Sequence, residues 1–92
     1  MKNKDILDLT IKKEKEKLQK LVDSKQYNDA NSKSGYILGL EEFASSDDFD
    51  IEGSETFTNQ QIETYLESNL YGDVAFLEAV LSGYEVAKNI TQ

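Results

Sequence analysis

Carboxylates are the only side chains of this chain that gather closely enough to suggest a chemistry. Five of them fall within nine positions, in a stretch that also holds two apolar residues: Asp47, Asp48, Phe49, Asp50, Ile51, Glu52 and Glu55. Carboxylate oxygens bind hard cations such as Ca²⁺, and a dense group of them also attracts a basic protein surface. The stretch therefore raises two chemistries, metal binding and recognition of a positively charged partner.

The spacing of some of these acids is similar to that of a calcium-binding loop. Positions 1, 3, 5, 6, 7, 9 and 12 of such a loop would be Asp48, Asp50, Glu52, Gly53, Ser54, Thr56 and Asn59. The stretch resembles the EF-hand over these twelve residues only. Asn59 replaces the bidentate glutamate of that family, and Glu55 replaces its usual aliphatic residue, so most calcium affinity should be lost. An acidic surface loop that contains Gly53 is the simpler interpretation, and we assign no metal ligand.

The composition leaves little room for catalysis. Histidine, cysteine, arginine, tryptophan and proline are absent from the 92 residues. Without histidine or cysteine, the Ser–His and Cys–His arrangements that activate a nucleophile cannot form. The five glycines fit neither the dinucleotide-binding nor the P-loop pattern. We therefore expect a protein that is not an enzyme, with no catalytic residue and no cofactor.

Charge is divided unevenly along the chain. The formal net charge is −8, and residues 1–33 hold nine lysines against six acids, whereas residues 34–92 hold Lys88 against twelve acids. A long stretch of one sign repels itself and steers molecules of the opposite sign, which favours a basic protein partner. We expect Glu63 and Glu67 to join the stretch 47–55 in binding it. Phe49 and Ile51, if exposed, would be its apolar anchors.

The lysines near the N-terminus do not indicate nucleic-acid binding. Glu14 and Glu16 interrupt the lysine run between Lys12 and Lys20. There is no arginine for bidentate contacts to bases and no aromatic residue within the run for stacking. We expect a salt-bridged solvent face or a coiled-coil surface there, and no direct contact with nucleic acid.

Helices must position these side chains. Leu7, Ile11, Leu18 and Leu21 recur at helical spacing, which predicts an amphipathic, lysine-rich helix within residues 1–24. That helix either packs on the core or extends from it. Apolar residues at positions 36, 37, 40, 43 and 44 predict a second helix that begins near position 29 or 31. Two glycines within it leave a short strand over residues 36–38 as an alternative.

The second half of the chain predicts a loop and two more helices. Residues 45–57 are expected to form an acidic loop, because Thr58 and Gln61 match a capping box and Phe57 and Ile62 match a hydrophobic staple. The last helix, over about residues 74–89, is apolar almost all round. The prediction is an all-α fold of one domain over residues 1–92. It is a small bundle of three to four helices, with the acidic loop (about 45–57) between the second and third.

Small residues suggest where two of these helices meet. Gly35 and Gly39 lie four positions apart, and the last helix carries Ala75, Ala79, Gly83 and Ala87 at the same spacing. Rows of small side chains permit close approach of two helices. We therefore expect the second and last helices to cross through these residues.

The sequence favours a binding role in the cytoplasm. No apolar run approaches the roughly 20 residues of a membrane span, and the N-terminal residues lack the apolar stretch expected of a secretory signal. Size, acidity and lack of catalytic residues resemble phosphate-mimicking proteins of phages and mobile elements and nuclease immunity proteins, although no motif ties the chain to them. We expect a non-catalytic inhibitor that occupies a basic, nucleic-acid-binding surface of a partner. The alternative is a structural adaptor whose N-terminal helix makes coiled-coil or homodimer contacts.

Overall fold

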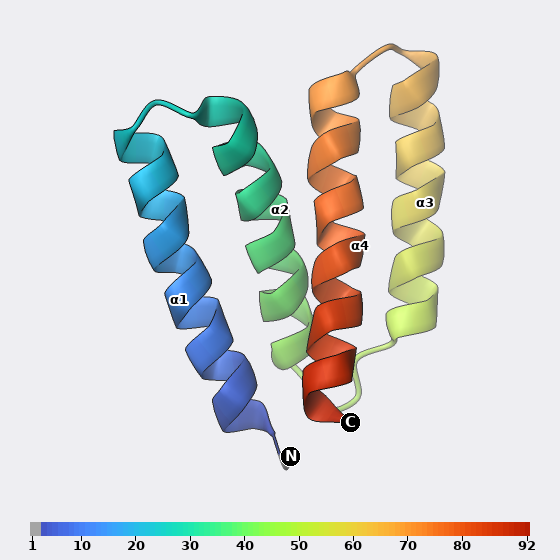
Figure 1. Ribbon diagram of the computed structural model, residues 1–92. Coiled ribbons are helices and arrows are strands. Elements are labelled where there is room, and N and C mark those ends of the chain that lie inside the picture. Colours follow the sequence, from blue (N-terminus) through green and yellow to red (C-terminus); the bar gives the residue numbers. More distant parts are fainter. Residues whose placement is uncertain (1–2) are drawn as a thin grey trace.

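The computed structural model describes residues 3–92 and holds four helices joined by short connections (Figure 1). They are α1 (Lys4–Asp23), α2 (Tyr27–Ala44), α3 (Ile51–Glu67) and α4 (Tyr71–Thr91). The described residues contain no strand, so the all-α prediction is confirmed, and the alternative strand over residues 36–38 is not formed. The second helix begins earlier than predicted, at Tyr27. Residues 1 and 2 of the predicted N-terminal region 1–24 lie outside the described residues.

The connection between α2 and α3 is shorter than predicted. Only Ser45–Asp50 are irregular, and residues 51–57 of the expected acidic loop belong to α3. Asp50 is the N-cap of α3, and its Oδ1 atom accepts a hydrogen bond of 3.0 Å from the backbone N–H of Gly53. The hydroxyl of Thr58 instead donates to the carbonyl of Ser54 inside the helix, at 2.8 Å. The predicted capping box and staple are therefore wrong, because an earlier aspartate already caps the helix.

The four helices lie side by side in the order α1, α2, α4, α3 (Figure 1). The array is thin, with Cα extents of 41 × 34 × 16 Å. The central helices α2 and α4 run in the same direction, and each outer helix runs antiparallel to its inner neighbour. Leu7 of α1 is fully buried with Leu40 of α2 and Ala87 of α4. The N-terminal helix therefore packs on the core and does not extend from it.

Small residues bring α2 and α4 into close contact, as predicted. A Cβ atom built on Gly39 would lie 3.0 Å from the Cα of Gly83, and one built on Gly83 would lie 2.9 Å from the Cα of Gly39. A Cβ atom on Gly35 would overlap the carbonyl oxygen of Phe76 and lie 3.2 Å from the Cβ of Ala79. Only a hydrogen atom fits at the three glycines, so the predicted crossing of these two helices is confirmed.

The hairpin α3–α4 repeats the hairpin α1–α2. A shift of 44 positions carries the end of α1 onto the end of α3 and the start of α2 onto the start of α4. Lys25 and Asn69 occupy the equivalent turn position, and both have φ of 59°. The next residues, Gln26 and Leu70, each donate a backbone hydrogen bond of 2.9 Å to the carbonyl five positions earlier. The two turns are thus built in the same way.

Contacts across the α2–α4 crossing are reciprocal under the same shift. A Cβ atom on Gly39 would overlap the carbonyl of Val80, and one on Gly83 would overlap the carbonyl of Tyr36, the equivalent of Val80. Such reciprocity is the mark of a two-fold relation. The chain is therefore two helical hairpins related by an approximate two-fold axis between α2 and α4. Residues buried at equivalent positions include the pairs Glu14/Thr58, Ala30/Val74, Gly39/Gly83 and Leu40/Tyr84.

Candidate protein-binding surface

The predicted partner-binding residues lie in the segment Ser45–Asp50 and along α3. We call their seven carboxylates the acidic edge: Asp47, Asp48, Asp50, Glu52, Glu55, Glu63 and Glu67. All are exposed except Glu55, which is half-buried. A rise of 1.5 Å per residue places Glu67 about 22 Å along α3 from Glu52. Three of these acids therefore lie in the connection that precedes α3, and the other four lie along the outer helix.

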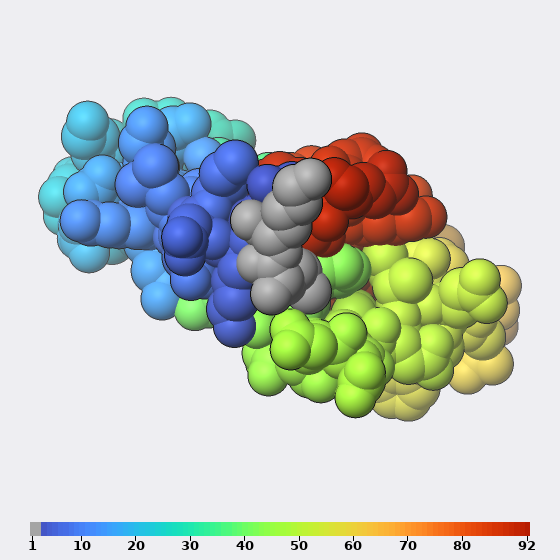
Figure 2. Space-filling model, turned by 90° about the horizontal axis from the view of Figure 1, so that it is seen from below, coloured from blue at the N-terminus to red at the C-terminus, as the bar shows by residue number. Residues whose placement is uncertain are grey.

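Local hydrogen bonds order the start of the acidic edge. The Ser45 hydroxyl donates to the carbonyl of Glu42 at 2.6 Å, which closes the end of α2. The backbone N–H of Asp48 donates to the Ser46 hydroxyl at 3.1 Å, and Asp50 then caps α3. Figure 2 views this end of the molecule, where the yellow-green residues at the start of α3 stand out on the opposite side from α1 in blue. Their backbone has a defined course before any partner binds.

Phe49 does not stand exposed in this segment. Its ring centroid lies 5.5 Å from that of Phe43 and 5.2 Å from that of Tyr84, with tilted planes in both pairs. Ile51 is also half-buried. These contacts join the segment to α2 and α4, and tilted aromatic pairs at such distances are favourable. Phe49 therefore holds the acidic segment on the core, and the expectation of two exposed apolar anchors here is not met.

Tyr84, whose ring packs against Phe49, also makes a polar contact between two helices. The buried hydroxyl of Tyr84 donates a hydrogen bond of 2.9 Å to Oε1 of Glu42, which links α4 to α2. Burial, together with the hydrogen bond to the Glu42 carboxylate, raises the pKa of Tyr84 to about 12. The phenol is therefore neutral at physiological pH and serves as a hydrogen-bond donor.

No carboxylate of the acidic edge forms an ion pair within residues 3–92. The described ion pairs use two other acids: Lys15 Nζ lies 2.8 Å from Glu41 Oε2, and Glu14 accepts from Lys17 and Lys33. The part of the chain from position 34 to position 87 has no basic residue at all. The acidic edge therefore presents uncompensated negative charge to the solvent.

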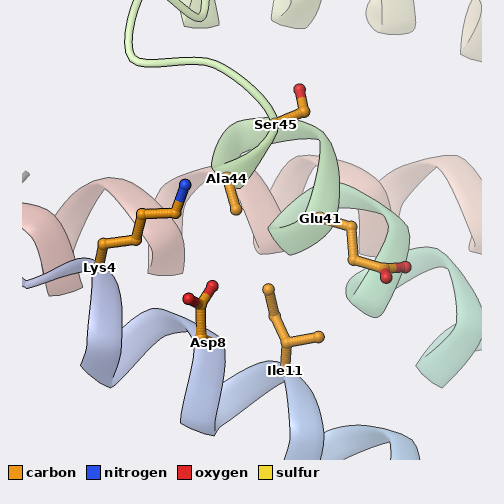
Figure 3. A pocket seen from close by; sticks show the side chains of 6 residues that line it. All are labelled: Lys4, Asp8, Ile11, Glu41, Ala44 and Ser45. Atoms are coloured by element: carbon orange, nitrogen blue, oxygen red, sulfur yellow. The ribbon is translucent and has the colours of Figure 1, made fainter.

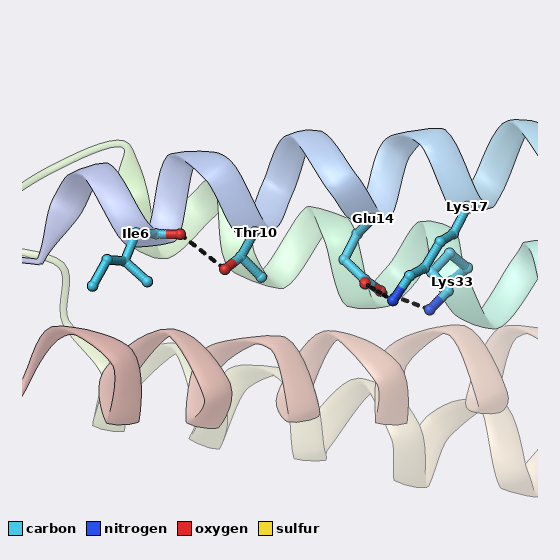
Figure 4. Close-up of polar contacts among 5 residues, drawn as sticks. All are labelled: Ile6, Thr10, Glu14, Lys17 and Lys33. Carbon is cyan, nitrogen blue, oxygen red and sulfur yellow. Dashed lines mark hydrogen bonds and ion pairs between the residues drawn. The ribbon is translucent and has the colours of Figure 1, made fainter.

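Glu14 sits at the centre of the paired charges on the other side of the molecule (Figure 4). Its carboxylate is nearly buried and lies 2.6 Å from Lys33 Nζ and 3.0 Å from Lys17 Nζ. Burial by itself would raise the pKa of Glu14, but hydrogen bonds and charge from the two lysines outweigh it, so its pKa lies below the ordinary value of 4.5. The pair with Lys33 links α1 to α2, whereas Lys17 pairs with Glu14 within α1.

Two large apolar side chains of α3 are exposed, Leu66 to 45% and Phe57 to a greater extent. Phe57 was assigned to a staple at a helix start, but it lies inside α3 and 61% of its surface is exposed. Because α3 begins at Ile51, Phe57 lies within the helix, on the side that faces the solvent. Knowledge that Asp50 is the N-cap would have been enough to predict it.

A groove of mixed charge lies at the surface of the described residues. The groove in Figure 3 has a volume of about 390 Å³ and lies between α1 and the end of α2, lined by Lys4, Asp8, Ile11, Glu41, Ala44 and Ser45. Its charged groups are of both signs and none is buried. The stretch that resembles an EF-hand is helical from Ile51 onward, so it cannot wrap around an ion as that loop does. Within residues 3–92, no three His, Cys, Asp or Glu side chains are grouped to hold a metal.

Comparison of the chain with protein-family models, with curated proteins and with solved structures found no match. Over residues 3–92, no helix has both the length and the apolar character needed to cross a bilayer. The acidic edge is therefore the candidate for a protein-binding surface.

Proposed function

We propose that this protein is a non-catalytic binding module that covers a basic surface of another protein with its acidic edge. The observation that carries this proposal is the set of carboxylates on and just before the outer helix α3, none of which forms an ion pair within residues 3–92. Charges of one sign held in a row speed encounter with a surface of opposite sign and suppress binding to acidic proteins.

An ordered acidic edge is also favourable for affinity. Flexible carboxylates lose rotational and backbone freedom when they bind, and that loss opposes association. Here the Asp50 cap and the Phe49 ring already fix the start of α3. The basic surfaces that such an edge fits include those of nucleic-acid-binding enzymes, whose own ligand is a row of phosphates. A protein bound there would compete with nucleic acid and so inhibit the enzyme.

The experiment compares two triple variants with the same change in charge. E52Q/E63Q/E67Q neutralises the exposed acids of α3, and D8N/E16Q/D23N neutralises three exposed acids of α1. Proteins captured on the wild type at low and moderate salt are identified, purified and tested for binding to each variant. The proposal expects a basic partner whose affinity falls for the α3 variant and whose binding is displaced by DNA or RNA. Equal affinity for both variants would contradict it.

The apolar residues of α1 that predicted the adaptor alternative lie toward the core, whereas Ile6 and Leu9 of the same helix are 54% and 51% exposed. Leu7 is fully buried, and Ile11 packs against the same core cluster. A coiled-coil seam needs an apolar stripe free for a partner helix. Polar substitutions at these positions would therefore unfold the protein instead of testing a coiled coil.

A further inference from the structure

Phe57 is exposed although the fold does not need an apolar residue at its position. The equivalent residue of the first hairpin, 44 positions earlier, is Lys13, which is also exposed on an outer helix. The first hairpin thus folds with a lysine at this position. A phenylalanine at the other leaves a large apolar side chain in water, where nothing in the described chain covers it.

Phe57 lies on the exposed side of α3, at one edge of the arc that holds the three exposed acids of this helix. At about 100° per residue, Glu52, Glu63, Glu67 and Phe57 fall within an arc of about 140° around the helix axis. The arc is exposed at all four residues, and α3 carries no basic residue. One partner surface can therefore contact the acids and the phenyl ring together.

We propose that Phe57 is the apolar anchor of the acidic edge, and that its partner is a protein with an apolar socket bordered by lysine or arginine. This inference rests on the proposed function. Charge complementarity decides the occupant, because a row of glutamates beside the ring repels an acidic surface and favours a basic one. Aromatic residues set among charged groups are typical of the few positions that dominate interface affinity.

The test uses two variants matched in exposure. F57Q removes the ring without changing charge, and Y27Q does the same at Tyr27, which is 62% exposed at the start of α2. Both positions lie at the surface, so both variants should fold, which circular dichroism checks. First, benzoylphenylalanine at position 57 or 27 of the full chain is photo-crosslinked in cells of the source organism. The crosslinked protein is identified and purified for affinity measurements.

We expect position 57, and not position 27, to crosslink a basic protein. F57Q should weaken its binding by about 10- to 100-fold, because the complex then no longer buries a phenyl ring. Y27Q should change the affinity by less than about twofold. The salt dependence should stay the same in F57Q and become shallower in E52Q/E63Q/E67Q, because only the latter removes charge.

Other outcomes overturn the inference. Absence of a crosslink at position 57, or crosslinking to a second copy of this chain, would contradict it. If F57Q binds like the wild type while E52Q/E63Q/E67Q binds weakly, the anchor is wrong and the proposed function stands. If neither variant loses affinity, the proposed function fails as well.

Discussion

Gly39 and Gly83 face each other across the approximate two-fold axis, so closely that a Cβ atom on either would come within 3.0 Å of the other's Cα. Helix backbones in such contact leave no room for relaxation, because the atoms met are those of the main chain. The same two residues are equivalent under the shift of 44 positions. The two halves of the chain therefore meet at a point where neither residue can carry a side chain without a shift of the backbone.

Alanine at either glycine should destabilise the fold. We expect Gly39→Ala and Gly83→Ala each to lower the free energy of unfolding by about 1–3 kcal/mol, because the added methyl group forces α2 and α4 apart. Gly72→Ala is the control, since a Cβ atom there meets nothing within 4 Å. It should raise stability by about 0.5–1 kcal/mol through its better helix propensity. Urea denaturation measures all three, and unchanged stability in the first two would disprove the close crossing.

Asp50→Ala should show where α3 begins. Loss of the side chain removes the hydrogen bond to the Gly53 N–H and should cost about 1 kcal/mol. Amide hydrogen exchange should increase mainly over residues 51–54. Asp48→Ala removes an equally exposed carboxylate that caps no helix and should have little effect on either measurement. Equal behaviour of the two variants would argue against Asp50 as the cap.

The ion pairs of Glu14 predict a dependence of stability on acid pH. The folded-state pKa of Glu14 is lowered by Lys33 and Lys17, so its stabilising contribution is complete above the unfolded value and is lost as pH falls through the folded value. Glu14→Gln should lower stability by about 1–2 kcal/mol at neutral pH. The variant should also lose less stability than the wild type between pH 5 and pH 3.

Glu16→Gln is the matched control for Glu14, because Glu16 is exposed and two positions away. Denaturant titrations at several pH values give the free energy of unfolding as a function of pH. Its slope should be the same for Glu16→Gln as for the wild type. If the free energy of unfolding of Glu14→Gln changed with pH as that of the wild type does, the buried Glu14 carboxylate would not have a lowered pKa.

At alkaline pH, the corresponding group is Tyr84. Its pKa is raised by burial and by Glu42 from 10.0 to about 12, so its contribution is complete below the unfolded value and is lost as pH rises toward the folded one. Tyr84→Phe should cost about 1 kcal/mol at neutral pH and should flatten the loss of stability above pH 10. Tyr71→Phe, at an exposed ring, should keep the wild-type profile, which denaturant titration can check.

Patterns within one helix were readable from the sequence. The small residues of the second and last helices share a spacing of four, and the packing of Gly35, Gly39 and Gly83 follows from it directly. The start of α3 was not readable in the same way. A helix could begin at Asp50, with its cap on Gly53, or at Thr58, with a capping box to Gln61. The structure uses Asp50, where Phe49 packs on Phe43 and Tyr84. That packing joins segments distant in the sequence, so the pattern of one helix does not reveal it.

In the candidate site, too, one feature could be predicted from the sequence and another could not. The sequence locates the negative charge, because charge depends on residue type alone. The outward position of Phe57 depends on the start of α3, and so it was missed. The repeat left a faint signal in the identities Tyr27/Tyr71, Asp29/Asp73 and Gly39/Gly83. Most equivalent positions, such as Glu14 and Thr58, share burial and not residue type, which sequence comparison of the halves cannot detect.

Joining two equivalent hairpins in one chain has an electrical consequence. Had the same shape been made by two identical chains, every surface charge would occur twice, and any dipole moment would have to lie along the two-fold axis. In the single chain, the outer helices differ: Lys13, Lys17 and Lys20 of α1 correspond to uncharged residues of α3. The molecule can therefore be polarised across its width, perpendicular to the axis. Near a positively charged surface, such a molecule rotates until α3 faces that surface.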